Sequence, residues 1–423
     1  TKMKMTKQMT INKNQIKGLS ILLISRTFER TAFYMIMSIL ILFLTKELNL
    51  ETTKAGTFYS IFYGIITIVS LFSGLLGDLT NRIKVVKIGM LLMTILYFSL
   101  IFLPNSYLIL LNGFILLGIS LGLNNTNISV FVGSIFNEKN TQIIGLTGFI
   151  LYSIVINIGA LFAPMIATSL RDSFGFNSIF ILAFILAGIS FVLYLIFSKI
   201  YSKLDLFIER KNEFETEKKY RNINLAIFLF VIILGIFIRF ILQQRELTFT
   251  FYIRDFVVNG FNFNENQKYL SIIFLLIFVV FTLIIRKLNW NKIFKIVLVG
   301  TIFGFIAYSL ASTFKATDVE KISQLPIQIV FIFLVISETI LYPTISYIIY
   351  RSSPIKFKGL FQGISYTIVS SQLLIFGIRI YEKTNPNITF LIFSLILLIS
   401  AISIIIFTKF IKNKESKLLE IDE

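Results

Sequence analysis

The stretch "KIYSKLDLFIERKNEFETEKKYRN", residues Lys199–Asn222, separates two apolar halves of the chain. It carries charges of both signs, whereas the sequence on either side repeats apolar runs of about 18 or more residues. Runs of that length cross the roughly 30 Å hydrocarbon core of a bilayer as helices. The stretch therefore divides a helical membrane protein into two parts.

The composition supports this class. Of the 423 residues, 56% are hydrophobic and only 15% are charged, whereas a soluble domain carries about 25% charged residues. The chain has neither cysteine nor histidine, which removes disulfides, thiol catalysis, imidazole proton transfer and the usual zinc ligands. Proton chemistry near neutral pH would therefore depend on carboxylates or lysines. We expect no metal and no cofactor.

Hydropathy predicts twelve transmembrane helices. They lie near residues 17–45, 56–77, 84–103, 107–134, 142–170, 177–199, 223–251, 268–286, 292–314, 326–350, 359–381 and 387–410. If the N-terminus is inside, the inner segments hold 27 of the 40 lysines and arginines, the outer loops 8 and the spans 5. The positive-inside rule predicts such an asymmetry, which supports both the helix count and the orientation.

The predicted organisation is an all-α membrane protein of two six-helix bundles. Its parts are an N-terminal bundle (1–199), a charged cytoplasmic linker (200–222), a C-terminal bundle (223–411) and a cytoplasmic tail (412–423). This plan resembles the major facilitator superfamily, whose bundles hold the substrate at mid-membrane and move around it. The alternative is a twelve-helix protein of another plan.

The charge distribution also predicts the location. Five lysines precede the first span, without the small-residue cleavage site of a signal peptide. We expect a multi-pass protein of the cell (inner) membrane with both termini cytoplasmic. The net charge of +18 then reflects topology in a lipid bilayer, not binding to nucleic acid.

One predicted inner loop, between the second and third helices, has a recognisable pattern. "SGLLGDLTNRIKVV" (Ser73–Val86) resembles the signature loop of the superfamily through Gly74, Gly77, Asp78 and Arg82. The resemblance implies an inner gate at Asp78 and Arg82, in which the Asp78 carboxylate connects to basic groups of the other bundle. The alternative is an ordinary basic inner loop.

A narrower resemblance starts in the first helix. "SRTFERTAFYMI" (Ser25–Ile36) is similar to the motif E-x-x-E-R-F-x-Y-Y of the proton-dependent oligopeptide transporter (POT) family, with matches at Glu29, Arg30 and Tyr34. Three further blocks resemble the fourth, the fifth, and the tenth and eleventh helices of that family: "LGISLGLNNTNISVFVGSIF" (117–136), "LYSIVINIGALFAPMIA" (151–167) and "SETILYPTISYIIYRSSPIKFKGLFQG" (337–363). The chain is thus identified as a divergent member.

Two departures from the family motifs concern charge. Arg26 stands where the family has its first glutamate, and Asn125 stands where the fourth helix of the family has a lysine. In the family these two residues belong to the machinery of proton coupling and carboxylate binding. Their replacement favours the alternative that coupling is altered or absent in this chain.

The charges of the first helix predict a ligand site. Arg26, Glu29 and Arg30 are spaced i, i+3, i+4 and share one helix face, and charges within a span face a partner or a water-filled cavity. The arginines could bind the carboxylate of a peptide, and Glu338 across the cavity could bind its ammonium group. Glu29 and Glu338 are the candidate proton carriers. The alternative is a purely structural charge cluster.

Further polar residues could line the same cavity. The candidates are Tyr34, Tyr63, Asn125, Asn127, Tyr152, Asn157, Gln243, Gln244 and Glu246. Their hydroxyl, amide and carboxylate groups could hold a peptide backbone without selecting a side chain. Each could instead tie two helices together, as polar groups often do in membranes.

The predicted function is secondary active uptake of di- or tripeptides, or of peptide-like zwitterions, by alternating access with proton symport. The first alternative is a facilitator, exchanger or exporter of another solute, such as an amino acid, drug or metabolite. The second is a receptor or scaffold that transports nothing. The sequence shows no nucleophile–base pair, metal set or cofactor loop, so we do not expect an enzyme. The expected partners are the small-molecule substrate, protons and lipid, and the expected state is a monomer.

Overall fold

The computed structural model describes a helical protein. The described residues are 13–102, 107–135, 142–202, 210–245, 248–257, 263–284, 288–314, 322–367, 377 and 379–420. In the first half, the helices are α1 (Lys13–Lys46), α2 (Thr52–Leu79), α3 (Arg82–Leu100), α4 (Tyr107–Ile135), α5 (Gln142–Phe174) and α6 (Phe176–Tyr201). In the second half they are α7 (Arg210–Gln243), α8 (Thr248–Phe256), α9 (Phe263–Ile284), α10 (Trp290–Ser312), α11 (Gln324–Ser352), the 3₁₀ turn η1 (Ile355–Phe357), α12 (Lys358–Thr367) and α14 (Pro386–Glu420).

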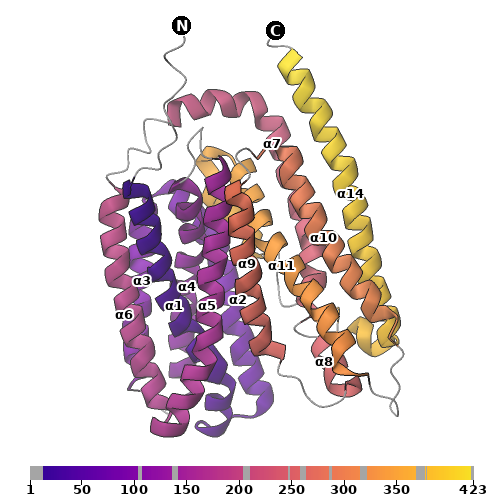
Figure 1. Ribbon diagram of the computed structural model, residues 1–423. Helices are drawn as coiled ribbons and strands as arrows, with labels where there is room; N and C mark the ends of the chain where they lie inside the picture. Colours follow the sequence, from indigo (N-terminus) through magenta and orange to yellow (C-terminus); the bar gives the residue numbers. More distant parts are fainter. Residues whose placement is uncertain are drawn as a thin grey trace.

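The helices confirm the predicted fold class of twelve spans in two bundles. Within the described ranges, ten helices are long and apolar enough to cross a membrane. An apolar segment inside α9, Leu270–Thr282, marks a further span. The predicted helix over 359–381 corresponds to α12 and the helical residues 379–383, and the segment 368–376 lies outside the described residues. Figure 1 shows the first six helices on one side and α10, α11 and α14 on the other.

The seventh predicted helix differs from the structure at both of its ends. It was expected to run from 223 to 251, but α7 starts at Arg210 and ends at Gln243, and a new helix begins at Thr248. The early start follows from the Glu, Lys and Arg content of residues 210–221, because these residues favour helix. At the break, the Thr248 hydroxyl donates to Gln244 Oε1 at 2.6 Å. A polar turn therefore interrupts this span.

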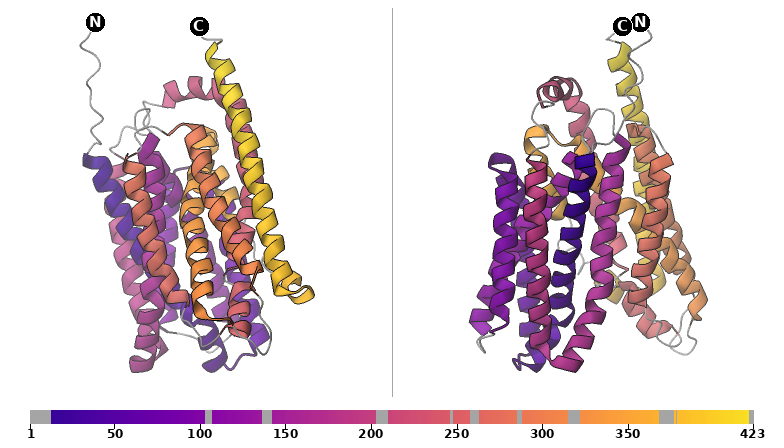
Figure 2. Two further views of the ribbon diagram at one scale, coloured as in Figure 1. Left: turned by 45° about the vertical axis from the view of Figure 1, so that its right-hand side comes forward. Right: turned by 60° about the vertical axis from the view of Figure 1, so that its left-hand side comes forward.

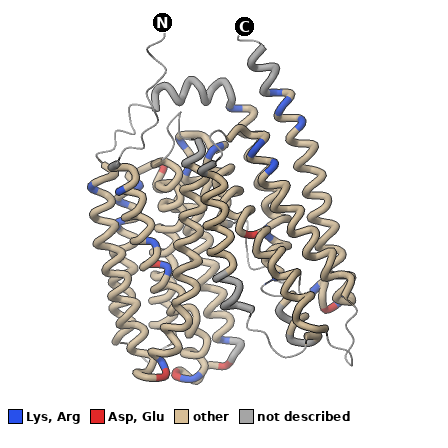
Figure 3. Tube along the Cα trace, viewed as in Figure 1, with Lys and Arg blue, Asp and Glu red and all other residues tan. Residues whose placement is uncertain are grey.

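The start of α1 and the end of α14 lie at one end of the molecule, which we call the terminal end; the opposite end is the distal end (Figures 1 and 2). Lysines and arginines gather at the terminal end (Figure 3), where α3 and α10 begin and α14 ends. The outer faces of the helices expose large apolar side chains, as a lipid-facing surface requires. Phe72, Leu79, Ile88, Ile233 and Ile399 are examples, with exposed fractions between 58% and 64%.

The two bundles meet closely where α2 contacts α12. Gly74 and Gly359 face each other so tightly that a Cβ on either would collide with the backbone of the other. One turn along, a Cβ on Gly363 would lie 2.8 Å from the carbonyl oxygen of Leu71. Glycine is needed here because two backbones pass without room for a side chain, a packing mode common between membrane helices.

A second contact joins α11 to α4 and α5. A Cβ added to Gly133 would lie 2.6 Å from the ring of Tyr350. A Cβ added to Gly145 would lie 2.8 Å from the ring of Tyr347. The apolar core of the second half accordingly continues into α4 and α5, with Val130, Leu146, Phe149, Ile150 and Ile154 as members. Gly133 lies near the end of α4, Gly145 near the start of α5 and Tyr350 near the end of α11, so this contact closes the terminal end.

Candidate functional site

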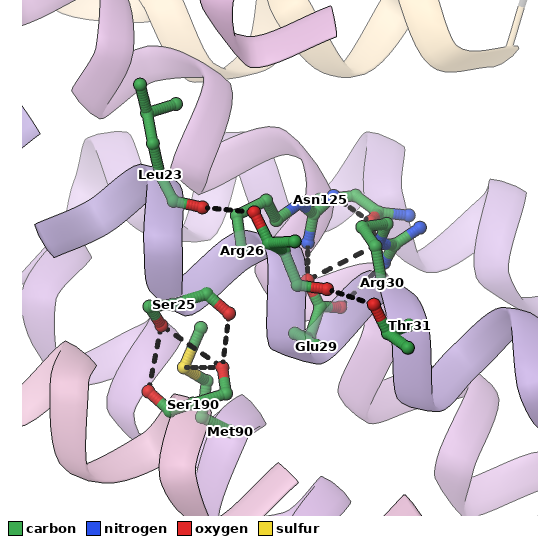
Figure 4. A network of polar contacts seen from close by, with 10 residues as sticks. Leu23, Ser25, Arg26, Glu29, Arg30, Thr31, Met90, Asn125 and Ser190 are labelled. Atoms are coloured by element: carbon green, nitrogen blue, oxygen red, sulfur yellow. Dashed lines mark hydrogen bonds and ion pairs between the residues drawn. The ribbon is translucent and has the colours of Figure 1, made fainter. Parts of the chain in front are cut away.

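The predicted charge cluster of α1 exists and is buried. Glu29 is inaccessible to solvent, and Arg26 and Arg30 are 1% and 8% exposed. Both oxygens of Glu29 accept hydrogen bonds: Arg26 Nη1 donates to Oε2, and Arg30 Nη2 donates to Oε1 at 2.6 Å (Figure 4). One carboxylate thus serves two guanidinium groups, and the cluster keeps an excess of one positive charge.

Asn125 of α4 completes the cluster. Its Oδ1 accepts from Arg26 Nη2 at 2.8 Å and from Arg30 Nη2 at 2.9 Å (Figure 4). An amide oxygen orients the two guanidinium groups but does not neutralise either of them. The prediction that Asn125 lies with the two arginines agrees with this geometry.

Neighbouring helices hold the charged face of α1 in position. On one side, the hydroxyl groups of Ser25 and Ser190 in α6 bond to each other's carbonyl oxygens at 2.8 and 2.9 Å. On the other side, Gly159 lets α5 approach, because a Cβ there would lie 3.0 Å from Arg30 Cβ. Because α5 and α6 hold the other sides of α1, the face with Arg26, Glu29 and Arg30 points toward α4.

Aromatic side chains surround the cluster. The guanidinium of Arg26 lies 5.5 Å from the ring centroid of Tyr152, and that of Arg30 lies 4.9 Å from the ring centroid of Phe33. Such contacts stabilise cations where water is scarce. The rings of Tyr34 and Tyr63 in turn contact Phe33, with centroids 5.1 and 6.2 Å from its centroid. Tyr34 and Tyr152, both predicted site residues, therefore adjoin the arginines.

The cluster lies at the boundary between the two bundles. Tyr366 of α12, in the second half of the chain, lies near Tyr152, Arg26 and Arg30. A substrate bound at the arginines would therefore be near groups of both bundles. This is the position that alternating access requires of a binding site.

Glu338 in α11 has a partner that the sequence did not predict. Its Oε1 accepts from Arg245 Nε at 2.8 Å and its Oε2 from Arg245 Nη2 at 2.9 Å. The expectation of a carboxylate that awaits an ammonium group is therefore wrong for this conformation. Arg245 was missed because it was placed inside a continuous helix, whereas it lies in the turn between α7 and α8. One sequence signal could have identified it: a charged side chain within a span needs a partner, and Arg245 is a cation within the predicted seventh span.

A fourth arginine approaches the boundary from α7. Arg239 Nη1 donates to the Ser365 carbonyl oxygen at 2.9 Å, and Nη2 lies 3.5 Å from Ser346 Oγ. Its guanidinium lies 5.8 Å from the ring centroid of Tyr342. No carboxylate among the described side chains forms an ion pair with Arg239.

Three other predicted candidates bond within the protein. Asn157 Nδ2 donates to the Ser153 carbonyl oxygen at 2.9 Å, Gln244 packs against Gly377, and Asn127 Nδ2 donates to the Ser73 hydroxyl at 2.7 Å. In this conformation Asn127 ties α4 to α2 and Gln244 stabilises the turn after α7, whereas the bond of Asn157 stays within α5. Gln243 is half-buried next to the turn, and Glu246 lies outside the described residues.

The predicted gate residues join the two bundles, though not to basic side chains. Asp78 at the end of α2 accepts hydrogen bonds from the backbone N–H groups of Gly359 (2.9 Å) and Leu360 (2.8 Å) at the start of α12. Arg82 donates to Asp78 and, at 2.9 Å, to Asn127 Oδ1. The carboxylate thus binds the first turn of a helix of the other bundle, where free N–H groups and the helix dipole favour an anion.

Comparison with known proteins assigns this architecture to a superfamily. The sequence model of the Major Facilitator Superfamily matches residues 22–377. The chain belongs to this superfamily. Asp78 and Arg82 lie in the segment Ser73–Val86 that resembles its signature; the structure has Asp78 in α2 and Arg82 at the start of α3.

Relatives within the superfamily are peptide transporters. The chain is 24% identical over 159 residues to the dipeptide and tripeptide permease A of Cronobacter turicensis, which covers 37% of this chain and 32% of the relative. It is 31% identical over 168 residues to the peptide transporter YePEPT of Yersinia enterocolitica, which covers 38% of this chain and 32% of the relative. The matched region spans about a third of the length of these relatives.

Solved structures share the fold over almost the whole chain. A POT family transporter in complex with 5-aminolevulinic acid superposes with a TM-score of 0.65 at 18% identity and covers 93% of this chain and 96% of that one. The human organic anion transporter MFSD10 superposes with a TM-score of 0.62 at 10% identity and covers 92% and 99%. The resemblance to the POT family is therefore confirmed, and the fold is the one of superfamily transporters.

Proposed function

We propose that this superfamily member takes up di- or tripeptides, or peptide-like zwitterions, by alternating access with proton symport. The observation that supports this most directly is the Arg26–Glu29–Arg30–Asn125 cluster at the boundary between two bundles. Its excess positive charge suits the carboxylate of a peptide, which guanidinium groups bind through paired N–H donors. The names of the relatives point to the same substrate class.

We propose the predicted organisation for the intact transporter. The N-terminal bundle comprises residues 1–199, the linker 200–222, the C-terminal bundle 223–411 and the tail 412–423. The lysine and arginine distribution supports a cell (inner) membrane protein whose termini are cytoplasmic. We further propose that it acts as a monomer. In that orientation the terminal end is cytoplasmic, so Asp78 and Arg82 form the closed inner gate.

Proton coupling can be tested at Glu338. In proteoliposomes that contain the purified protein, we expect an inwardly directed proton gradient to drive dipeptide accumulation and Glu338→Gln to abolish it. Glu382→Gln is the matched control, because Glu382 is exposed. Undiminished gradient-driven uptake by Glu338→Gln would refute the role of Glu338.

Loss of folding must be separated from loss of coupling. Removal of one partner of a buried ion pair costs about 3–5 kcal/mol because the other charge remains unpaired. The double variant Arg245→Gln/Glu338→Gln removes both charges, so we expect it to recover most of the thermal stability while it remains inactive. If the double variant regained gradient-driven uptake, the defect of Glu338→Gln would be one of stability alone.

A second candidate function is a facilitator or exchanger without proton coupling. It is favoured by the ion pairs of both proposed proton carriers, because Glu29 and Glu338 each bond to arginine through both oxygens. A pH-sensitive dye inside the liposomes distinguishes the two candidates. Peptide entry that acidifies the interior supports symport, whereas entry or exchange without acidification supports the second candidate.

A further inference from the structure

Cations outnumber carboxylates when the half-buried Arg239 is counted with the buried charges of the described spanning segments. Arg26 and Arg30 share Glu29, and Arg245 is neutralised by Glu338. Arg239 adds a cation without a carboxylate. Guanidinium groups do not deprotonate in proteins. The region therefore carries two positive charges in excess, one in each bundle.

Arg239 belongs to the boundary between the bundles, as the row of side chains beside it shows. Tyr342, Ser346 and Tyr350 are spaced by four residues and lie on one face of α11. At one end of this row, Tyr350 packs against Gly133 of α4, so this end contacts the first bundle. Arg239 contacts both Tyr342 and Ser346.

Tyr366 connects Arg239 to the cluster of α1. Arg239 Nη1 donates to the carbonyl oxygen of Ser365, the residue before Tyr366, at 2.9 Å, and Tyr366 itself lies near Arg26 and Arg30. The guanidinium groups of the two bundles thus lie around one tyrosine of α12. A single small ligand next to Tyr366 would be within the field of all three.

The hydrogen-bonding capacity of Arg239 is only partly used. Its Nε is buried without a hydrogen-bond partner, and the contact of Nη2 with Ser346 is long, at 3.5 Å. An unneutralised cation within a membrane is costly, so it usually serves a ligand or a substrate path. An anionic group would accept these N–H groups in short, charge-assisted bonds.

We propose that Arg239 binds a second acidic group of the substrate, so that the site selects ligands with two anionic groups. Among peptides, these are di- or tripeptides with an Asp or Glu side chain. One carboxylate is bound at Arg26 and Arg30, and the other at Arg239. This inference rests on the proposed function, because it names the substrate class of the same site.

The test compares two dipeptides of nearly equal shape. Ala-Glu and Ala-Gln differ by one negative charge, so their affinity ratio reports the binding of that charge. With the purified full chain in detergent, we expect isothermal titration to give about 10- to 100-fold tighter binding of Ala-Glu, the worth of a hydrogen bond to a charged group. In Arg239→Gln we expect the ratio to fall to about one.

A matched control has the same chemical change elsewhere in a span. Arg379 is exposed, so Arg379→Gln should keep the preference for Ala-Glu. Arg239→Lys keeps the charge and should keep most of the preference, which shows that a loss in Arg239→Gln is not caused by misfolding.

The outcomes separate this inference from the proposed function. Equal affinities of Ala-Glu and Ala-Gln for the unmodified protein would overturn the inference and leave peptide transport intact. A preference that persists in Arg239→Gln would also overturn it. If neither peptide binds but the dicarboxylate glutarate binds in an Arg239-dependent way, the two-anion site is supported and the peptide assignment fails.

Discussion

The substitution Asp78→Asn should open the terminal end of the transporter. Asp78 accepts two backbone hydrogen bonds from the first turn of α12, at 2.9 and 2.8 Å, and these cross between the bundles. Its bond with Arg82 connects α2 to the start of α3 within one bundle, so we expect that bond in both open and closed states. Only the two bonds to α12 therefore bias the equilibrium.

The magnitude follows from the chemistry of the amide. A hydrogen bond to a charged group contributes about 1.5–3 kcal/mol, and a neutral one about 0.5–1.5 kcal/mol. The asparagine keeps a single acceptor oxygen, while its NH₂ group would face an N–H donor. We therefore expect closure to lose about 2–4 kcal/mol, which lowers the closed-to-open ratio by about 30- to 1000-fold.

Spin-label distances can measure this change. The chain has no cysteine, so cysteines introduced at the exposed positions Lys84 and Lys356 are labelled without background. These positions lie in different bundles at the terminal end. Double electron–electron resonance in lipid nanodiscs should show a longer distance population for Asp78→Asn than for the unmodified protein.

A surface carboxylate provides the control. Asp172 is exposed and pairs with Arg171 on the surface, so Asp172→Asn should leave the distance distribution unchanged. The reasoning would be refuted if Asp78→Asn kept the distribution of the unmodified protein. It would also be refuted if both substitutions lengthened the distance equally.

Two further predictions concern packing and charge. Gly74→Ala would place a Cβ against the backbone of Gly359, so we expect the same longer spin-label distance and a lower melting temperature. The control is Gly64→Ala in the same helix. A Cβ there would have no atom within 4 Å, so this substitution should change neither the distance nor the melting temperature. Asn125→Lys would add a third cation beside Arg26 and Arg30, so we expect poor yield of folded monodisperse protein on size-exclusion chromatography. The double variant Arg26→Glu/Asn125→Lys restores charge balance and should restore the yield of the unmodified protein. If Asn125→Lys alone gave the same yield as the double variant, the charge argument would be contradicted.

The prediction of the site from sequence succeeded where neighbours along one helix decide the geometry. The i, i+3, i+4 spacing placed Arg26, Glu29 and Arg30 on one face, and the structure joins them by ion pairs. It was wrong for Glu338, because its partner Arg245 lies 93 residues away. That pairing depends on the turn that ends α7, and apolar periodicity does not report such a turn.

The sequence by itself determined the membrane class, the division into two bundles and the positions of most spans, because hydrocarbon imposes length and polarity on every spanning segment. Tertiary structure decided which charges are neutralised and which remain. Asp78 binds backbone groups of α12, and Glu338 is occupied by Arg245. Arg239 approaches the bundle boundary, and no carboxylate in the described part of the chain pairs with it. Ion pairing depends on a few ångströms between side chains of different helices, and no sequence pattern specifies those distances.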